Sequence, residues 1–249
     1  MPRIARTIIP RIKKAIDKYG VLGSILRSPL LPIHLYRDYK SARSLPTHTE
    51  PSEFDVRYGV NTDGDIDHVT FLSDLEIPSA NWIHGADYGP IRPGRFFAAI
   101  SKLAIRFEDF VFVDLGSGKG RALLLASHYP FKRIIGVEFS PQLHAVAEKN
   151  IQRYSDPAQR CRLIESVCMD FTEFCLPLDP LVLCLNRPAN EVPLTKLMDN
   201  VRNSFNAHPR QLWVIFFALD RYESIFERTN FLIRMVEDRT GNFDIYKSK

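Results

Sequence analysis

A short glycine-rich segment contains the residues that could hold a ligand. The segment 114–120, DLGSGKG, follows an apolar run, and Glu138 ends the next apolar run. Glycines at the end of a strand let the backbone approach a ligand closely. An acid at the end of the following strand can accept hydrogen bonds from two ribose hydroxyls. Together the two features predict a site for an adenosine-containing cofactor.

Asp114 helps to decide which cofactor would fit. The dinucleotide fingerprint GxGxxG leaves a helix N-terminus free for a pyrophosphate, whereas this turn reads GxGxG and follows an acid. The carboxylate of Asp114 would repel a pyrophosphate, but it would suit a ligand with a cationic end, such as the amino group of methionine. The phosphate-loop pattern fails too, because Gly120 and not Ser or Thr follows Lys119.

Strands and helices alternate around this segment. Apolar runs predict strands at 110–116, 133–139, 161–170, 180–187 and 211–219, and amphipathic stretches predict helices at 120–130, 141–154 and 191–207. Ser140 is expected to cap the second of these helices, with Pro141 at its first position. The last two strand-like runs, 231–238 and 243–249, are joined by RTGN, which is too short for a parallel crossover. The order predicts a doubly wound α/β sheet that ends in an antiparallel hairpin.

Composition indicates a globular chain with a basic leader. The 249 residues are 45% apolar and 25% charged, as in ordinary folded proteins, and no apolar run approaches the roughly 18 residues of a membrane-spanning helix. Residues 1–50 carry ten Lys and Arg against three acids, a net charge of +7, which leaves −3 for residues 51–249. Isoleucines recur every four residues from 4 to 16, with Lys and Arg between them. This pattern predicts a basic amphipathic helical extension and a linker. The extension would either contact an anionic membrane or a nucleic acid, or pack on the domain with a solvated charged face.

Cysteine and histidine usage predicts a cytoplasmic protein without a catalytic metal. The four cysteines form no CxxC pair, no secretory signal is recognisable, and the seven histidines show no metal-binding spacing. Cys161, Cys168 and Cys175 are expected in the core as small apolar residues.

Two segments resemble a known family. FVDLGSGKGRALLLAS (112–127) and GVEFSPQLHAVAEKN (136–150) resemble the class I S-adenosylmethionine-dependent methyltransferases. The resemblance implies a seven-stranded, mostly parallel sheet over residues 91–249, and S-adenosyl-L-methionine as cofactor. FDVRYGVNTDG (54–64) and the SAN, HG and Tyr pattern of 79–88 resemble a bacterial group of this family, which makes 51–90 a lid or N-terminal segment. The glycine turn is also similar to that of non-SET lysine methyltransferases, which implies an amine acceptor such as a protein lysine.

The resemblance also implies roles for single residues. Asp114, Gly116 and Gly118 would surround the methionine end, Glu138 would hold the ribose, and Asp170 would accept the adenine amino group. The full set of implied cofactor-binding residues is Asp114, Gly116, Ser117, Gly118, Glu138, Phe139, Asp170 and Phe171. A purely structural role is the alternative for each acid, and for Asp170 that role would be a helix cap.

The acceptor side is less well defined. Amino-group methyltransferases often carry an NPPY-like motif after the fourth strand, and here the residues 186–189 read NRPA. The missing aromatic residue disfavours an adenine acceptor, because a flipped base stacks on such a ring. Asn186 is predicted to orient the acceptor, with an ordinary turn residue at the end of a strand as the alternative. Tyr88 is predicted to close over the methionine or the acceptor. Trp82 and Tyr58 could add an aromatic wall for a cation, and the alternative is a packed lid with a hydrogen-bonded histidine.

Two other functions stay open from the sequence. One is an NAD-dependent oxidoreductase, and the other is a non-catalytic module that keeps the fold and the cofactor pocket.

Overall fold

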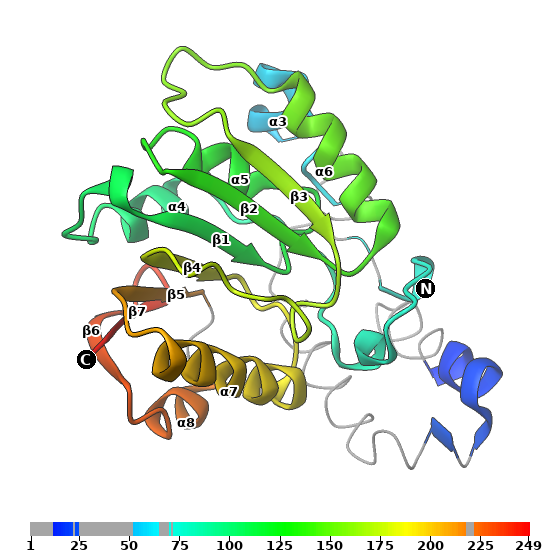
Figure 1. The fold of residues 1–249 in the computed structure, drawn as a ribbon. Helices are drawn as coiled ribbons and strands as arrows, with labels where there is room; N and C mark the ends of the chain where they lie inside the picture. Colours follow the sequence, from blue (N-terminus) through cyan, green and yellow to red (C-terminus); the bar gives the residue numbers. More distant parts are fainter. Residues whose placement is uncertain (1–11, 22, 25–51, 65–69, 71, 218–221) are drawn as a thin grey trace.

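A seven-stranded sheet organises the chain. The computed structural model describes residues 12–21, 23–24, 52–64, 70, 72–217 and 222–249. The strand order is β3-β2-β1-β4-β5-β7-β6 (Figure 1). The strands are β1 (Val111–Leu115), β2 (Arg133–Glu138), β3 (Ile164–Cys168), β4 (Leu181–Leu185), β5 (Leu212–Phe216), β6 (Leu232–Asp238) and β7 (Phe243–Ser248). The first five run parallel, and β7 and β6 form the antiparallel hairpin, so the predicted fold is confirmed.

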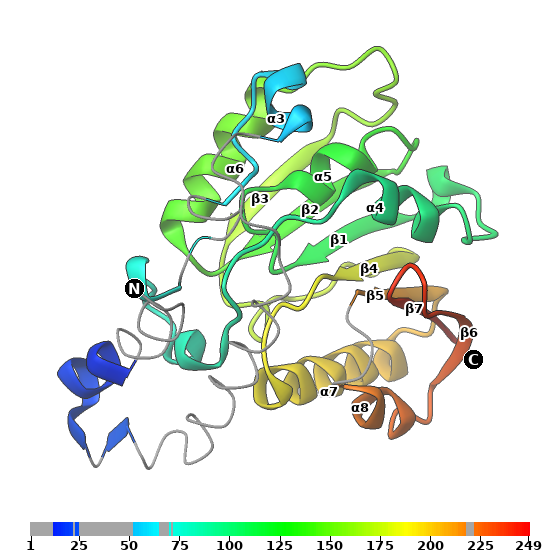
Figure 2. The same ribbon diagram turned by 180° about the vertical axis from the view of Figure 1, so that it is seen from behind.

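Helices cover both faces of the sheet. The helices are α4 (Pro93–Ile100), α5 (Arg121–Ala126), α6 (Pro141–Arg153), α7 (Glu191–Ala207) and α8 (Glu223–Glu227). Figures 1 and 2 show α7 and α8 on one side of the sheet and α4, α5 and α6 on the other. Alternate residues of β1 follow this division: Val113 packs in the cluster that includes α7, and Phe112 packs in the cluster that includes α4 and α5. Every residue of β1, β4 and β5 is buried, as expected for strands covered on both faces.

Local sequence signals predict α6 and α7 well and the sheet edge less well, and α5 is shorter than the predicted helix 120–130. Ser140 caps α6 by accepting a hydrogen bond from Leu143 N, Pro141 is its first residue, and α7 has the predicted bounds. In contrast, β3 is shorter than the predicted run and half exposed, because it is the edge of the sheet. The prediction that three cysteines are core residues is wrong for Cys168 and Cys175, which are exposed.

The residues before α4 form a layer of short segments. They include α3 (Glu53–Tyr58) and the 3-10 turns η1 (Leu72–Asp74) and η2 (Ala80–His84). Residues 12–21 are helical, in agreement with the predicted extension, whereas the predicted linker up to residue 50 lies outside the described residues. Within the described ranges, no helix has the length and apolar character needed to cross a membrane.

Candidate cofactor site

The glycine turn after β1 depends on its glycines. Gly116, Gly118 and Gly120 have φ values of 87°, 54° and 86°, in the left-handed region that favours glycine. A Cβ on Gly116 would lie 2.9 Å from Cβ of Pro188, and one on Gly118 would lie 2.1 Å from Cε2 of Tyr88. The turn therefore needs glycine for its conformation and for close packing.

A cavity lies next to this turn, where the strand order reverses between β1 and β4. The space outside protein atoms at this place is about 840 Å³, open solvent included. Parallel strands place ligand sites at this switch point. The predicted site residues that line the cavity are Asp114, Gly116, Ser117, Glu138, Phe139, Asp170, Phe171, Asn186 and Tyr88. Gly118 lies behind the ring of Tyr88 and donates its N–H to Oε2 of Glu138 at 2.8 Å.

Asp114 is a buried carboxylate with an unsatisfied oxygen. Its exposed fraction is 3%, and its Oδ1 has no hydrogen-bond partner among the described residues. Burial raises the pKa of Asp114 to about 7, a hydrogen bond with Cys184 opposes that shift, and the charge of Glu138 adds to it. A cationic ligand group at Oδ1 would therefore stabilise the ionised form.

Glu138 is held in one orientation by the backbone. Oε2 accepts from Gly118 N at 2.8 Å, and Oε1 accepts from Ser140 N at 2.9 Å. Burial raises the pKa of Glu138 to about 7, against the hydrogen bonds from Ser140, Gly118 and Phe139. A carboxylate has about four acceptor positions, so hydroxyl donors can still bind to these oxygens.

Asp170 joins the sheet to residues 72–90, called the lid below. Its Oδ2 accepts from Ser79 Oγ at 2.5 Å and from Asn81 Nδ2 at 2.8 Å, and its Oδ1 accepts from Thr172 N at 2.9 Å. Burial acts to raise the pKa of Asp170, but the hydrogen bonds, led by that from Ser79, lower it overall. Asp170 thus makes a local turn contact, but no helix begins directly after it, so it is not the helix cap that the structural alternative proposed. Ser79 and Asn81 had no predicted role, although they belong to the SAN pattern.

The segment 52–64 forms a buried clasp over α5. Arg121 is 5% exposed, and one of its terminal nitrogens lies 3.2 Å from Asp55 Oδ1 and 3.3 Å from Asp63 Oδ1. Asp55 also accepts hydrogen bonds from the N–H groups of Thr62 and Asp63, both at 2.8 Å. The hydroxyl of Tyr88 donates to the carbonyl of Thr62 at 2.5 Å, and burial raises the pKa of that hydroxyl. The clasp, defined as residues 52–64, therefore fixes the tyrosine that covers the glycine turn.

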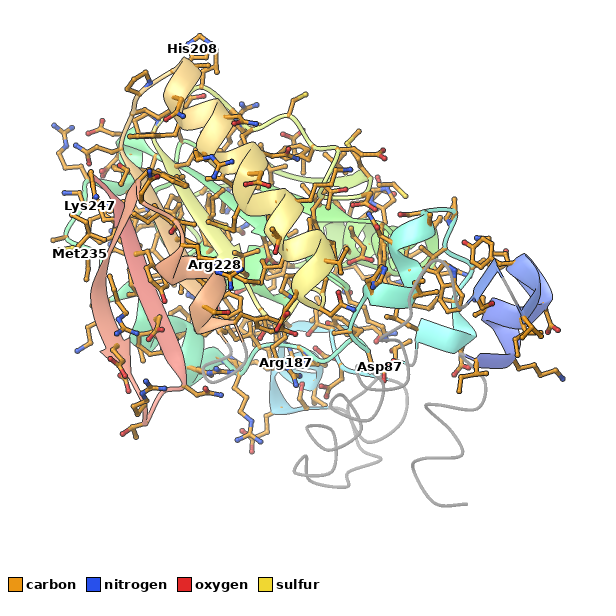
Figure 3. The ribbon with its side chains drawn as sticks, turned by 90° about the horizontal axis from the view of Figure 1, so that it is seen from below. Asp87, Arg187, His208, Arg228, Met235 and Lys247 are labelled. Atoms are coloured by element: carbon orange, nitrogen blue, oxygen red, sulfur yellow. The ribbon has the colours of Figure 1, made fainter. Side chains whose placement is uncertain are left out.

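The lid meets the loop after β4. Asn186 Nδ2 donates to the carbonyl of Gly89 at 3.3 Å, and Gly85 and Ala189 form an antiparallel bridge. The side chains of Asn190 and His84 lie 2.9 Å apart at Nδ2 and Nδ1. Arg187 and Asp87 also line the cavity, and Figure 3 places both at the same edge of the molecule. Asn186 and Tyr88 are thus brought to one cavity, and their predicted catalytic roles stay predictions.

The predicted aromatic wall is wrong. The ring centroid of Tyr58 lies 4.9 Å from that of Phe54 and 4.9 Å from that of Tyr154, in a cluster outside the cavity lining. Trp82 is 1% exposed and packs behind the lid, where Lys14 Nζ lies 5.3 Å from its ring centroid. Among the side chains that the structure describes, no three His, Cys, Asp or Glu residues are grouped so that they could hold a metal ion.

Solved structures share features of this fold at low identity. A predicted N6-adenine-specific DNA methylase from Listeria monocytogenes is 15% identical with a TM-score of 0.47, over 67% of this chain and 56% of that one. An RNA methyltransferase from Salinibacter ruber, in complex with S-adenosyl-L-homocysteine, is 17% identical with a TM-score of 0.42, over 64% and 92%. A ribosomal protein L11 methylase from Lactobacillus delbrueckii subsp. bulgaricus is 14% identical with a TM-score of 0.47, over 65% and 80%.

The chain thus spans just over half the length of the Listeria protein. No protein-family model matches the sequence, and no curated protein matches it. Because one fold can serve many functions, the function of this chain has to be inferred from its own site.

Proposed function

We propose that the chain is an S-adenosylmethionine-dependent methyltransferase whose cofactor binds in the cavity beside the glycine turn. One observation carries the proposal: Asp114, which has a buried carboxylate oxygen without a hydrogen-bond partner among the described residues, lines the same cavity as Glu138. Burying a charge is costly unless a partner compensates it. The cationic amino group of the methionine moiety would supply that partner, and ribose hydroxyls would complete the hydrogen bonding of Glu138.

The remaining lining fits the other end of the same ligand. Phe139 and Phe171 offer apolar surface. Asp170 accepts four hydrogen bonds, from Ser79, Asn81 and the N–H and hydroxyl groups of Thr172, which fill its acceptor positions, so the adenine amino group would have to displace one of these donors. Asp170 already accepts from the lid residues Ser79 and Asn81, so adenine recognition and lid position would share one carboxylate. A nicotinamide dinucleotide fits less well, since its pyrophosphate would meet the charge of Asp114.

For the acceptor we propose an amine, such as the side chain of a protein lysine. When bound, S-adenosylmethionine supplies an electrophilic methyl group for an in-line displacement. Asn186 lines the cavity, and its Oδ1 can accept a hydrogen bond from the acceptor amine and so direct the nitrogen lone pair. Tyr88, held by the clasp, limits the space in which the acceptor can lie. Catalysis would then be mostly positioning, since a neutral amine needs no base to attack.

Calorimetry with S-adenosyl-L-homocysteine and NAD tests the proposal. The wild type should bind the first ligand and not the second, and Asp114→Asn should weaken binding roughly 10- to 150-fold, the loss of one charge-assisted hydrogen bond. Asp109→Asn, an exposed acid paired with Arg106, is the matched control and should bind like the wild type. Binding unaffected by Asp114→Asn would overturn the site assignment.

A labelling assay tests the acceptor. The wild type and Asn186→Ala are incubated with lysate and methyl-tritiated S-adenosylmethionine. Label on protein lysine that is lost in the Asn186 variant is the expected result. Cofactor binding without transfer to any lysate component would instead favour the non-catalytic module.

A further inference from the structure

The N-terminal helix, residues 12–21, packs on the outside of the lid, defined here as residues 72–90. Ala15 is 1% exposed and shares an apolar cluster with Leu75 and Trp82. Lys14 Nζ donates to the carbonyl of Leu75 and lies over the Trp82 ring, 5.3 Å from its centroid. Lys18 Nζ donates to the carbonyl of Ile77 at 3.4 Å. The helix thus contacts the lid through apolar packing and two lysine–carbonyl bonds.

The other side of the same cluster is the wall of the cavity. Leu72, Leu143 and the partly buried Phe139 belong to the cluster of Ala15 and also line the cavity. The carbonyl of Trp82 accepts from the N–H of Gly85, which is a further lining residue. A displacement of the helix therefore changes the support of side chains that would touch the cofactor.

A second connection runs through the turn η2. Ser79 and Asn81 begin this turn and donate to Asp170, and Trp82, the next residue, lies under Lys14. One short turn thus joins the lysine on its outer side to the carboxylate on its inner side.

We propose that helix 12–21 and the lid act as one unit, anchored by Lys14 as a positioning residue, and that docking of this unit and cofactor binding stabilise each other. This inference rests on the proposed function. Two events that favour the same closed arrangement strengthen each other by the same factor, because binding linkage is reciprocal. Cofactor should therefore stabilise a helix that it does not touch.

The proposal also bears on the basic character of the leader. The ammonium groups of Lys14 and Lys18 each donate to a carbonyl of the lid, so an anionic membrane or nucleic acid that drew them away would break these two bonds. Such a contact, if it uses these lysines, would compete with the closed lid. Lys13 is exposed on the same helix, so an anion could bind it without displacing the helix from the lid.

Hydrogen exchange and ligand affinity on the full chain test the coupling. Exchange of the peptide amides of 12–21 and 72–84 is followed with and without saturating S-adenosyl-L-homocysteine. The ligand affinity of Lys14→Met, Lys14→Arg and the matched control Lys13→Met is then measured by calorimetry. Thermal unfolding of each variant without ligand reports any loss of overall stability.

In the wild type, ligand should slow exchange in both segments. Lys14→Met should weaken ligand binding about tenfold, the loss of a charge-assisted hydrogen bond and a cation–π contact. Lys14→Arg, which keeps a donor and a cation, should restore most of the affinity, and Lys13→Met should bind like the wild type.

Three results would overturn the inference. If S-adenosyl-L-homocysteine slowed amide exchange in 72–84 but not in 12–21, the helix would not be coupled to cofactor binding. If Lys14→Met bound S-adenosyl-L-homocysteine as tightly as the wild type, Lys14 would contribute only to the stability of the fold, even if the unfolding temperature fell. A wild type that fails to bind S-adenosyl-L-homocysteine would refute the proposed function, and the coupling with it.

Discussion

Cofactor affinity should depend on pH through Asp114. Its pKa is raised to about 7, mainly by burial, and only its ionised form attracts a cationic amino group. With that pKa, about nine-tenths of Asp114 is protonated near pH 6 and about nine-tenths is ionised near pH 8. The affinity for S-adenosyl-L-homocysteine should therefore fall about tenfold from about pH 8 to about pH 6, which is about 1.4 kcal/mol.

Two variants separate Asp114 from Glu138 in this experiment. Calorimetry across the pH range should show weak, nearly pH-independent binding in Asp114→Asn. Glu138→Gln should also bind weakly, but it should keep the pH dependence with a lower midpoint, because the charge of Glu138 helps to raise the pKa of Asp114. If the affinity for S-adenosyl-L-homocysteine changed equally with pH in the wild type and in Asp114→Asn, the reasoning would be refuted.

The same carboxyls should make the ligand-free protein less stable as pH rises. Their folded pKa values of about 7 lie above the ordinary values of 3.8 and 4.5. The folded state therefore binds more protons than the unfolded state between those limits. Their contribution to stability is complete below about pH 4 and is lost as pH rises through about 7. Thermal unfolding of the wild type should show this loss, and Asp114→Asn should show less of it.

Three further substitutions test the surroundings of the site. Arg121→Met leaves two buried aspartates without their cation and should lower the free energy of unfolding in urea by about 3–5 kcal/mol; an unchanged midpoint would contradict the buried ion pairs. Gly118→Ala should weaken S-adenosyl-L-homocysteine binding, because its Cβ would overlap the Tyr88 ring, whereas Gly94→Ala, with open space around it, should bind normally in the same titration. Arg187→Gly should raise the free energy of unfolding by about 0.5–1 kcal/mol, since φ at Arg187 is 48°; a loss of stability would show that its side chain matters more than its backbone.

The carboxyl ends of the strands were the predictable part of the site. Asp114 and Glu138 each end an apolar run, and adjacent parallel strands end at the same edge of a sheet, so a one-dimensional pattern was enough to bring them together. Asp170 and Asn186 follow β3 and β4 by the same rule, and both line the cavity. The doubly wound order then determines which side of β1 each one reaches.

The lid and the clasp were not predictable in this way. Arg121 pairs with Asp55 and Asp63, which are far away in the sequence and have no periodic relation to it. Trp82 was expected to face a ligand, but in a short irregular turn neither period 2 nor period 3.6 tells which way a side chain points. Its ring instead lies under a lysine of the N-terminal helix.

The clasp is attached to the rest of the protein by stronger contacts than the N-terminal helix is. The clasp is joined to α5 by buried ion pairs and to Tyr88 by a hydrogen bond, and opening it would expose Arg121 and two aspartates without partners. The helix contacts the lid through Lys14, Lys18 and a few apolar side chains, and its outer face is exposed. Local opening occurs where few contacts have to be broken. We therefore expect the cofactor to enter past the lid while the clasp stays closed, so that ligand-free exchange is fast in 72–84 and slow in 54–62.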